Sequence, residues 1–183
     1  MNKQVPKLRF KEFSDEWQSE KLNNIVSFTK GKNYSKNDLT SSGNPIILYG
    51  QMYTHYQSLI KQVNTFVHKI NDNNIYSKGN EVILPSSGET NIDIARASAV
   101  KMPNIILGGD LIILTPKKTL ENYFLALNLT YSNAKNEIIK QAQGKTIVHI
   151  HTNDLLKIKI NYPSLKEQCK IGQFFNNSRK SFV

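Results

Sequence analysis

Residues 81–100 read EVILPSSGETNIDIARASAV, and this stretch determines which kind of fold the chain can adopt. Two short apolar runs, at 81–84 and 97–102, have the length and composition of strands. Between them, Pro85 ends the first run, and the SSGET segment at 86–90 combines small hydroxyl residues with one glycine. Such a segment forms either a plain turn or a loop whose backbone approaches another molecule closely. The stretch therefore predicts strands that end in polar loops.

The rest of the chain interleaves similar strands with helical patterns. Apolar runs at 46–49, 110–115, 147–150 and 156–160 predict further strands. The irregular order of strands and helices predicts an α+β fold, a mixed, twisted β-sheet with a few helices, ending in the start of a C-terminal helix.

Three helices are expected from their end signals and apolar faces. The first begins at the N-cap Thr119 and carries one apolar face, made by Leu120, Tyr123, Phe124 and Leu127. The second ends at Gly144, a residue type typical of helix ends. The third follows Pro163, where Ser164 and Glu167 have the spacing of a capping box.

Charge and cysteine usage restrict the class of protein. The 183 residues carry a net charge of +10, and a globular chain this basic usually binds a polyanion, most often nucleic acid. Cys169 is the single cysteine, so no disulfide can form within the chain, and a reducing cytoplasm fits. The N-terminus lacks the apolar core of a signal peptide, and no run of about 18 apolar residues suggests a membrane span.

The motifs of common enzymes are missing from the sequence. It contains no G-x-x-x-x-G-K, no G-x-G-x-x-G, no Asp/Glu-x-Lys triplet and no Asn/Asp-Pro-Pro-aromatic motif. His149 and His151 could share a strand face and bind a metal with Asp154, but a strand face with two polar ends is the favoured interpretation. Ser86 or Ser87 as a nucleophile would need a base that no nearby residue supplies. We therefore predict no catalytic residue, no metal and no cofactor.

Five segments of the chain carry a family resemblance. Residues 5–22 read VPKLRFKEFSDEWQSEKL, and residues 162–175 read YPSLKEQCKIGQFF, which contains P-x-L-x-E-Q-x-x-I-x-x-F. Between them lie KGNEVILPSSGET (78–90), LGGDLIIL (107–114) and QGKTIVHI (143–150). In this order the segments resemble a specificity subunit of type I restriction-modification enzymes, over almost the whole chain.

The resemblance implies DNA sequence recognition without catalysis. A full specificity subunit has two target-recognition domains, each reading one half of a bipartite duplex site, and two long helices that hold the methyltransferase (modification) subunits. A restriction motor-nuclease subunit then joins. The present sequence has no internal repeat and runs NNSRKSFV after Phe175. We therefore expect a half-sized or truncated subunit, for which a homodimer would restore two half-sites.

The resemblance also suggests three segments along the chain. We expect an extended basic N-terminal arm at 1–16, the target-recognition domain at 17–162, and the start of the C-terminal helix, truncated, at 163–183. On that helix, the residues expected to contact a partner subunit are Ile171, Phe174 and Phe175. The alternatives are that they pack on the domain itself or on a second helix.

Four groups of residues are expected to contact DNA, with lysines and backbone on phosphates and polar side chains on base edges. In chain order they are Lys30, Lys32, Tyr34 and Lys36; Gln51 and Tyr53; Ser86, Ser87, Gly88, Glu89 and Thr90; and Gln143, Lys145 and Thr146. Glu89 could accept from a cytosine amino group, and Gln143 could pair with adenine. The plainer interpretations are a solvated loop, a strand-end turn and a helix C-cap.

Two other classes of function stay open. One is a nucleic-acid-binding module without sequence preference, whose binding would depend steeply on salt. The other is a small hydrolase that uses Ser86 or His149.

Overall fold

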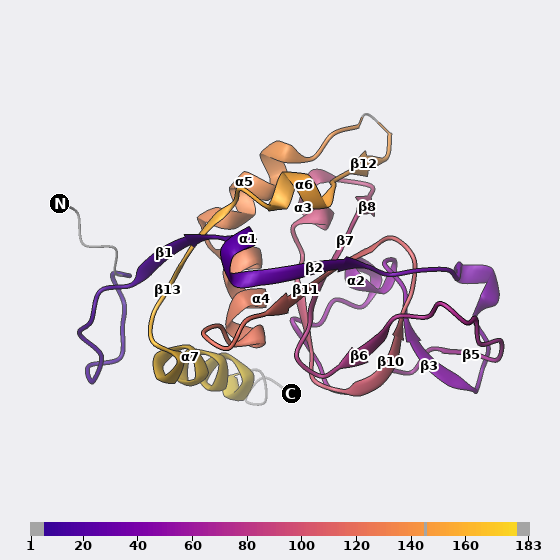
Figure 1. Ribbon diagram of the computed structural model, residues 1–183, viewed down its shortest axis with the longest axis horizontal. Helices are drawn as coiled ribbons and strands as arrows, with labels where there is room; N and C mark the ends of the chain where they lie inside the picture. Colours follow the sequence, from indigo (N-terminus) through magenta and orange to yellow (C-terminus); the bar gives the residue numbers. More distant parts are fainter. Residues whose placement is uncertain (1–5, 145, 179–183) are drawn as a thin grey trace.

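The central element of the computed structural model, which describes residues 6–144 and 146–178, is a five-stranded sheet (Figure 1). Its strand order is β2-β11-β7-β9-β4, with the bounds Val26–Lys30, Leu111–Pro116, Val82–Pro85, Ser98–Val100 and Leu59–Ile60. Neighbouring strands are antiparallel, except that β9 and β4 are parallel. The apolar runs predicted at 81–84, 97–102 and 110–115 therefore lie side by side in one sheet.

A four-stranded sheet packs on one face of this central sheet. Its order is β5-β3-β10-β6, with the bounds Phe66–Val67, Asn44–Ile47, Pro103–Leu107 and Tyr76–Lys78. Strands β3 and β10 are parallel, and the other pairs are antiparallel. Ile105 and Leu107 from this sheet share a buried cluster with Ile83, Leu111 and Ile113 from the five-stranded sheet. The two sheets are thus joined by apolar side chains.

Helices cover the other face of the five-stranded sheet. The main ones are α4 (Asn122–Tyr131) and α5 (Asn133–Gln141), while α7 (Leu165–Ser178) lies along the lower edge in Figure 1. Leu84 and Ile112 pack in one buried cluster with Leu125 and Leu129 of α4. Because successive strand residues point to opposite faces, β7 and β11 are buried on both sides, which explains their unbroken apolar runs.

The remaining elements are short. Strand β1 (Gln18–Lys21) pairs antiparallel with β13 (Lys159–Tyr162), and β8 (Ser87–Gly88) pairs antiparallel with β12 (Val148–His149). The short helices are α1 (Leu22–Ile25), η1 (Lys36–Asp38, a 3-10 helix), α2 (Gln51–Thr54), α3 (Asn91–Ile94) and α6 (Thr152–Leu155). The predicted α+β class is confirmed. Over the described ranges 6–144 and 146–178, every helix is too short or too polar to cross a membrane.

Several predicted element ends were wrong. Helix α4 is capped by Glu121, whose carboxylate accepts from the Phe124 N–H at 2.6 Å, and not by Thr119. Helix α5 ends at Gln141 because Ala142 has extended backbone, so Gly144 is not its C-cap. The strand expected from 156 begins only at 159, because the preceding residues continue the turn of α6.

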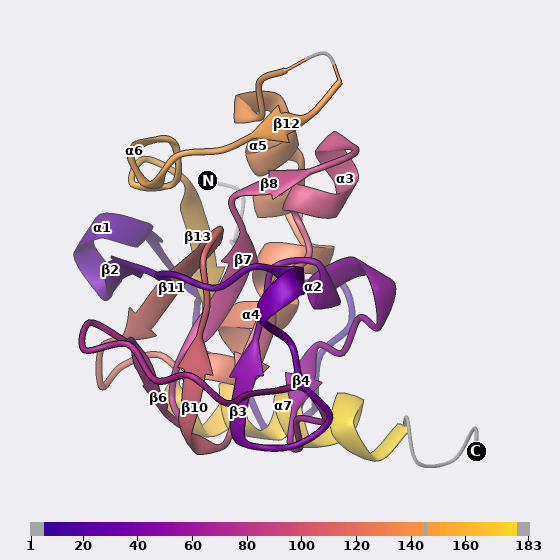
Figure 2. The ribbon, with the colours of Figure 1, turned by 90° about the vertical axis from the view of Figure 1, so that its right-hand side faces the viewer.

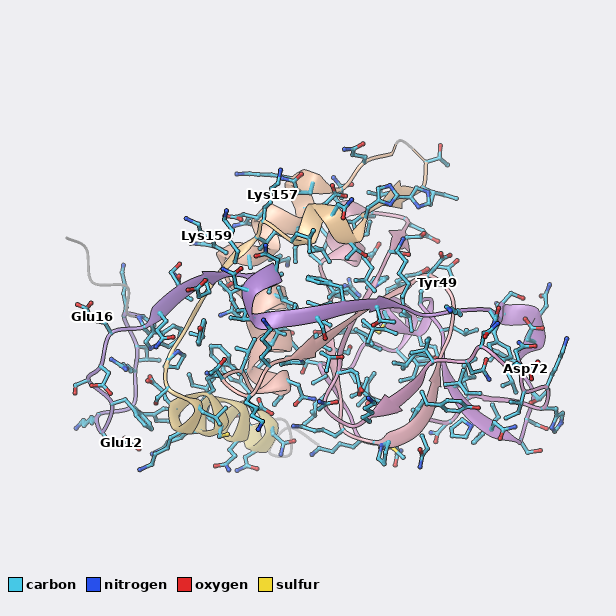
Figure 3. The ribbon with its side chains drawn as sticks, viewed as in Figure 1. Glu12, Glu16, Tyr49, Asp72, Lys157 and Lys159 are labelled. Carbon is cyan, nitrogen blue, oxygen red and sulfur yellow. The ribbon has the colours of Figure 1, made fainter. Side chains whose placement is uncertain are left out.

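The described part of the N-terminal segment packs on α7. Arg9 donates from Nε and Nη2 to the two carboxylate oxygens of Glu167, both at 2.7 Å. The Phe10 ring meets the Phe174 ring edge to face at 6.0 Å between centroids. Glu12, labelled beside α7 in Figure 3, pairs with Lys170. The Glu167 carboxylate, expected in a capping box, therefore anchors Arg9 to α7.

Candidate nucleic-acid interface

Backbone hydrogen bonds join loops that lie far apart in the sequence. The Gly109 N–H donates to the Asn33 carbonyl at 2.7 Å, and the Ser86 N–H donates to the Asp110 carbonyl at 2.8 Å. The Ile150 N–H then donates to the Ser86 carbonyl at 3.0 Å. These three bonds connect four segments in series, and they do so without depending on any side chain.

We call the surface formed by residues 30–36, 86–90, 143–144 and 146–150 the loop face. Strands β8 and β12 lie beside each other and next to α3 in both views of the ribbon (Figures 1 and 2). The loop face therefore brings together three of the four residue groups that were predicted from the sequence to contact DNA.

The 86–90 segment combines packed and exposed residues. Gly88 packs closely, since a Cβ there would lie 3.2 Å from the Cβ of Asp93. The Thr90 hydroxyl caps α3, accepting from the Asp93 N–H at 3.2 Å and donating to the Asp93 carboxylate at 2.6 Å. Glu89 is exposed, whereas Ser87 is only 8% exposed. In the unbound chain, Glu89 is therefore the more available side chain and Thr90 is held in the fold.

Residues 143–149 form a hairpin that projects from the domain. The backbones of Gln143 and His149 exchange two hydrogen bonds, at 2.9 and 2.7 Å. Gly144 has φ +139, and a Cβ there would overlap the carbonyl oxygen of Ile147, so this turn requires glycine. Gln143 and Thr146 are exposed, while Lys145 lies outside the described residues. The backbone bonds between Gln143 and His149 thus hold two exposed polar side chains, Gln143 and Thr146, at this end of the fold.

The basic loop is anchored by its aromatic residue. Lys30, Lys32 and Lys36 are all exposed. The Tyr34 hydroxyl donates to the Lys69 carbonyl at 3.0 Å and accepts from the Asn71 N–H at 3.1 Å. Tyr34 also has φ 56, a left-handed backbone conformation that is costly for a non-glycine residue and often found at functional sites. Tyr34 therefore fixes the loop that presents the three lysines.

The fourth predicted group lies on α2, next to the 86–90 segment. The Gln51 amide is used internally, since its Oε1 accepts from the Leu48 N–H at 3.0 Å and its Nε2 donates to Thr65 Oγ1 at 2.6 Å. Burial, the neighbouring Tyr49, and the carboxylates of Glu89 and Asp93 raise the pKa of Tyr53 to about 12. Tyr53 is thus a neutral hydroxyl near the loop face at physiological pH.

Comparison with known proteins identifies the family. A family model described as the type I restriction modification DNA specificity domain matches residues 14–181. The chain belongs to this family. The resemblance predicted from the end motifs is therefore confirmed, and the family is one of specificity domains, which are not catalytic. A search of curated proteins finds no match.

Solved structures share the fold of this specificity domain. The S subunit of a type I restriction-modification system from M. genitalium has 18% identity and a TM-score of 0.69, over 96% of this chain and 42% of that chain. The HsdS subunit from Thermoanaerobacter tengcongensis has 16% identity and a TM-score of 0.61, over 97% and 40%. A chain from a structure of complex assembly and conformational transition in the type I R-M system has 16% identity and a TM-score of 0.64, over 94% of this chain and 41% of that chain. The specificity domain spans about two fifths of these chains.

One side-chain pair on the loop face was not predicted. Ser87 Oγ lies 3.0 Å from His149 Nδ1, a contact between residues on different strands that no local sequence signal could reveal. Within residues 6–144 and 146–178, no carboxylate hydrogen-bonds to this imidazole, so a third group that would orient a catalytic base is missing. Asp154 accepts from the His151 N–H, and the same ranges hold no cluster of three or more His, Cys, Asp or Glu residues suited to a metal.

The C-terminal helix of the specificity domain presents apolar side chains. Phe174 is 55% exposed and Phe175 47% exposed, whereas Ile171 packs partly against the main core. A pocket of about 350 Å³ lies between this helix and the N-terminal segment, lined by Pro6, Leu8, Arg9, Phe10, Trp17, Glu167, Ile171, Phe174 and Phe175. Exposed aromatic residues next to an apolar pocket suit contact with another protein.

Proposed function

We propose that this chain is the DNA-reading module of a non-catalytic specificity subunit of a type I restriction-modification system. It binds one half of a bipartite duplex target through the loop face. The observation that carries the proposal is the series of backbone bonds through Asn33, Gly109, Asp110, Ser86 and Ile150, which holds three loops in one rigid arrangement. A reading surface needs this rigidity, because base discrimination depends on hydrogen-bond geometry.

Within this proposal, the basic loop supplies the phosphate contacts. Lys30, Lys32 and Lys36 are exposed and flexible enough to reach backbone phosphates, where each neutralised phosphate releases counterions. Tyr34 positions the loop through its hydroxyl, as its bonds to the 69–71 segment suggest.

The other two loops supply the contacts to base edges. Glu89, Gln143 and Thr146 are exposed and carry acceptor or donor groups. A carboxylate beside DNA repels phosphates, so Glu89 suits a cytosine amino group. Gly88 packs against Asp93 and Gly144 against Ile147, so both glycines keep the backbone beside these side chains tightly turned.

Smaller roles remain for the other predicted DNA-binding residues. Ser86 and Ser87 support the 86–90 segment from within, and Thr90 fixes its end as the cap of α3. Gln51 positions α2, and Tyr53 offers a neutral donor at the rim. Lys145 adds a positive charge to the hairpin sequence.

The proposed partners follow from the same assignment. The methyltransferase (modification) subunit would contact Ile171, Phe174 and Phe175, and the restriction motor-nuclease subunit would join through it, in the cytoplasm. Methylation and cleavage would belong to those subunits. A homodimer that uses the C-terminal helix would place two copies of the loop face on one duplex.

The test is a selection from random-sequence duplex DNA at physiological salt, with the modification subunit of the same system present. One enriched motif of a few base pairs supports a single reading module, and two copies at a fixed gap support a dimer. Binding without any enriched motif contradicts sequence recognition and leaves the generic nucleic-acid-binding alternative.

A matched pair of variants locates the binding surface. We expect Lys30→Gln with Lys32→Gln to weaken binding to all sequences and to lower the slope of log K against log salt by about 2. Lys157→Gln with Lys159→Gln removes the same charge from two exposed residues outside the loop face, on the segment after α6 and on β13, where both are labelled in Figure 3. Equal losses for the two pairs would mean that binding follows net charge and not the loop face.

A further inference from the structure

The hairpin directs one histidine away from the core. Val148 and Ile150 are 4% and 1% exposed and pack in the main cluster. Because side chains alternate along extended backbone, His149 between them points to the opposite side, and it is exposed. The register of β12 with β8 places it opposite Ser87.

The imidazole of His149 contacts the Ser87 hydroxyl through its Nδ1 atom. Ser87 Oγ is 3.0 Å from His149 Nδ1, and Ser87 is 8% exposed. In the part of the chain that the structure describes, Nδ1 is the one side-chain acceptor that this hydroxyl meets. The Ser87 hydroxyl can donate to Nδ1 or accept from an Nδ1–H group, depending on the tautomer of the ring. In the tautomer whose Nδ1 accepts, the ring proton lies on Nε2, on the far side of the ring from Ser87.

We propose that His149 reads a purine, with its Nε2–H donating to N7 in the major groove, and that Ser87 positions the ring and fixes its tautomer. This inference rests on the proposed function of the loop face. Both purines present N7 as an acceptor at this edge, whereas cytosine presents an amino donor that an N–H group cannot pair with. Thymine presents the O4 acceptor beside its C5-methyl group, so an effect of removing N7 is the observation that separates a purine contact from a thymine contact.

The backbone pairing and the core contacts of the hairpin do not involve the histidine side chain. The two bonds between Gln143 and His149 use backbone atoms only, and the core contacts come from Val148 and Ile150. Replacement of the imidazole leaves all of these in place, so an effect on DNA binding is separable from unfolding.

The experiment measures Kd for the enriched duplex and for versions in which each purine in turn is replaced by its 7-deaza analogue, which lacks N7. The complex with the modification subunit is used throughout. For the unaltered chain, we expect one 7-deaza position to weaken binding about fivefold, the effect of one hydrogen bond. His149→Ala should bind the natural duplex more weakly by the same factor. The 7-deaza purine at that position should then weaken its binding no further.

Two further variants separate reading from structure. His149→Gln keeps a donor near the place of Nε2 and should keep part of the response to that 7-deaza position. Ser87→Ala should relax the base preference at that one base pair and leave the other positions unchanged. His68→Ala, an exposed histidine beside β5, is the control and should match the unaltered chain.

Each other outcome is decisive. If a motif is enriched, but 7-deaza purines weaken binding equally for His149→Ala and for the unaltered chain, the role of His149 alone is overturned. A uniform loss on every sequence would mean a phosphate contact, which also overturns it. No enriched motif for the unaltered chain overturns the proposed function, and the reading role with it.

Discussion

Gly144→Ala tests whether the hairpin geometry serves DNA binding. Gly144 has φ +139, and a Cβ there would overlap the Ile147 carbonyl oxygen and lie 3.0 Å from the Cα of Val148. These are backbone atoms, so the clash can be relieved only by moving the turn. An alanine in such a glycine-only conformation costs about 1–3 kcal/mol.

The cost should appear in binding more than in stability. Thr146 and Ile147 at the tip are exposed, and two backbone bonds close its base, so the tip can open without disturbing the core. If DNA binds only the closed hairpin, about 1–3 kcal/mol raises Kd by roughly 5-fold to 150-fold. If the whole fold bore the strain instead, Tm would fall by about 2–4 °C for each kcal/mol.

The assay compares Kd for the enriched duplex, by fluorescence anisotropy, with Tm from thermal denaturation. Gly50→Ala is the matched control, because Gly50 has helical backbone and no atom lies within 4 Å of a Cβ built there. We expect this control to keep Kd and to keep or slightly raise Tm. An unchanged Kd for Gly144→Ala, or a fall in Tm with no loss of binding, would refute the reasoning.

Three further changes test the core, the basic loop and the rim. Ile83→Ala removes a fully buried side chain from the apolar cluster between the two sheets. It should lower the free energy of unfolding, measured by urea titration, by about 2–5 kcal/mol. A smaller loss would mean that Ile83 is not central to the packing between the sheets. Tyr34→Phe removes the three hydrogen bonds of the hydroxyl, to the Lys69 carbonyl, the Asn71 N–H and the Asn74 amide. It should cost about 1 kcal/mol of stability and weaken DNA binding on all sequences, whereas a change in base preference would contradict a positioning role. The pKa of Tyr53 is raised from 10.0 to about 12, so its contribution to stability is present below pH 10 and is lost as the pH rises to about 12. Tyr53→Phe should therefore make the decline of Tm over that pH range less steep. Parallel curves of Tm against pH for the two chains would contradict this.

The surface on α7 connects the domain to its proposed partners. The N-terminal segment reaches this helix through Arg9 and Phe10, so the exposed Phe174 and Phe175 belong to a surface built from both ends of the chain. A partner that binds there contacts two segments at once. The position of this surface along one edge of the fold leaves the loop face free for DNA.

Local patterns were sufficient for the family, the fold class and the main strands. The end motifs at 5–22 and 162–175 identified the family, and the apolar runs marked β7, β9 and β11, because strands buried on both faces need nothing but apolar residues. Helix ends were less predictable. Thr119 and Glu121 are both capable of capping α4, and the sequence does not say which backbone geometry each will adopt.

The sequence by itself also identified loops with suitable chemistry for DNA, since hydroxyls, amides and lysines beside glycine are local features. Only the tertiary structure decided how those residues are used. It assigns the Gln51 amide nitrogen to Thr65, fourteen residues away, and it brings Ser87 against His149. The physical reason is that hydrogen bonds between distant segments depend on strand pairing, which no single stretch of sequence encodes.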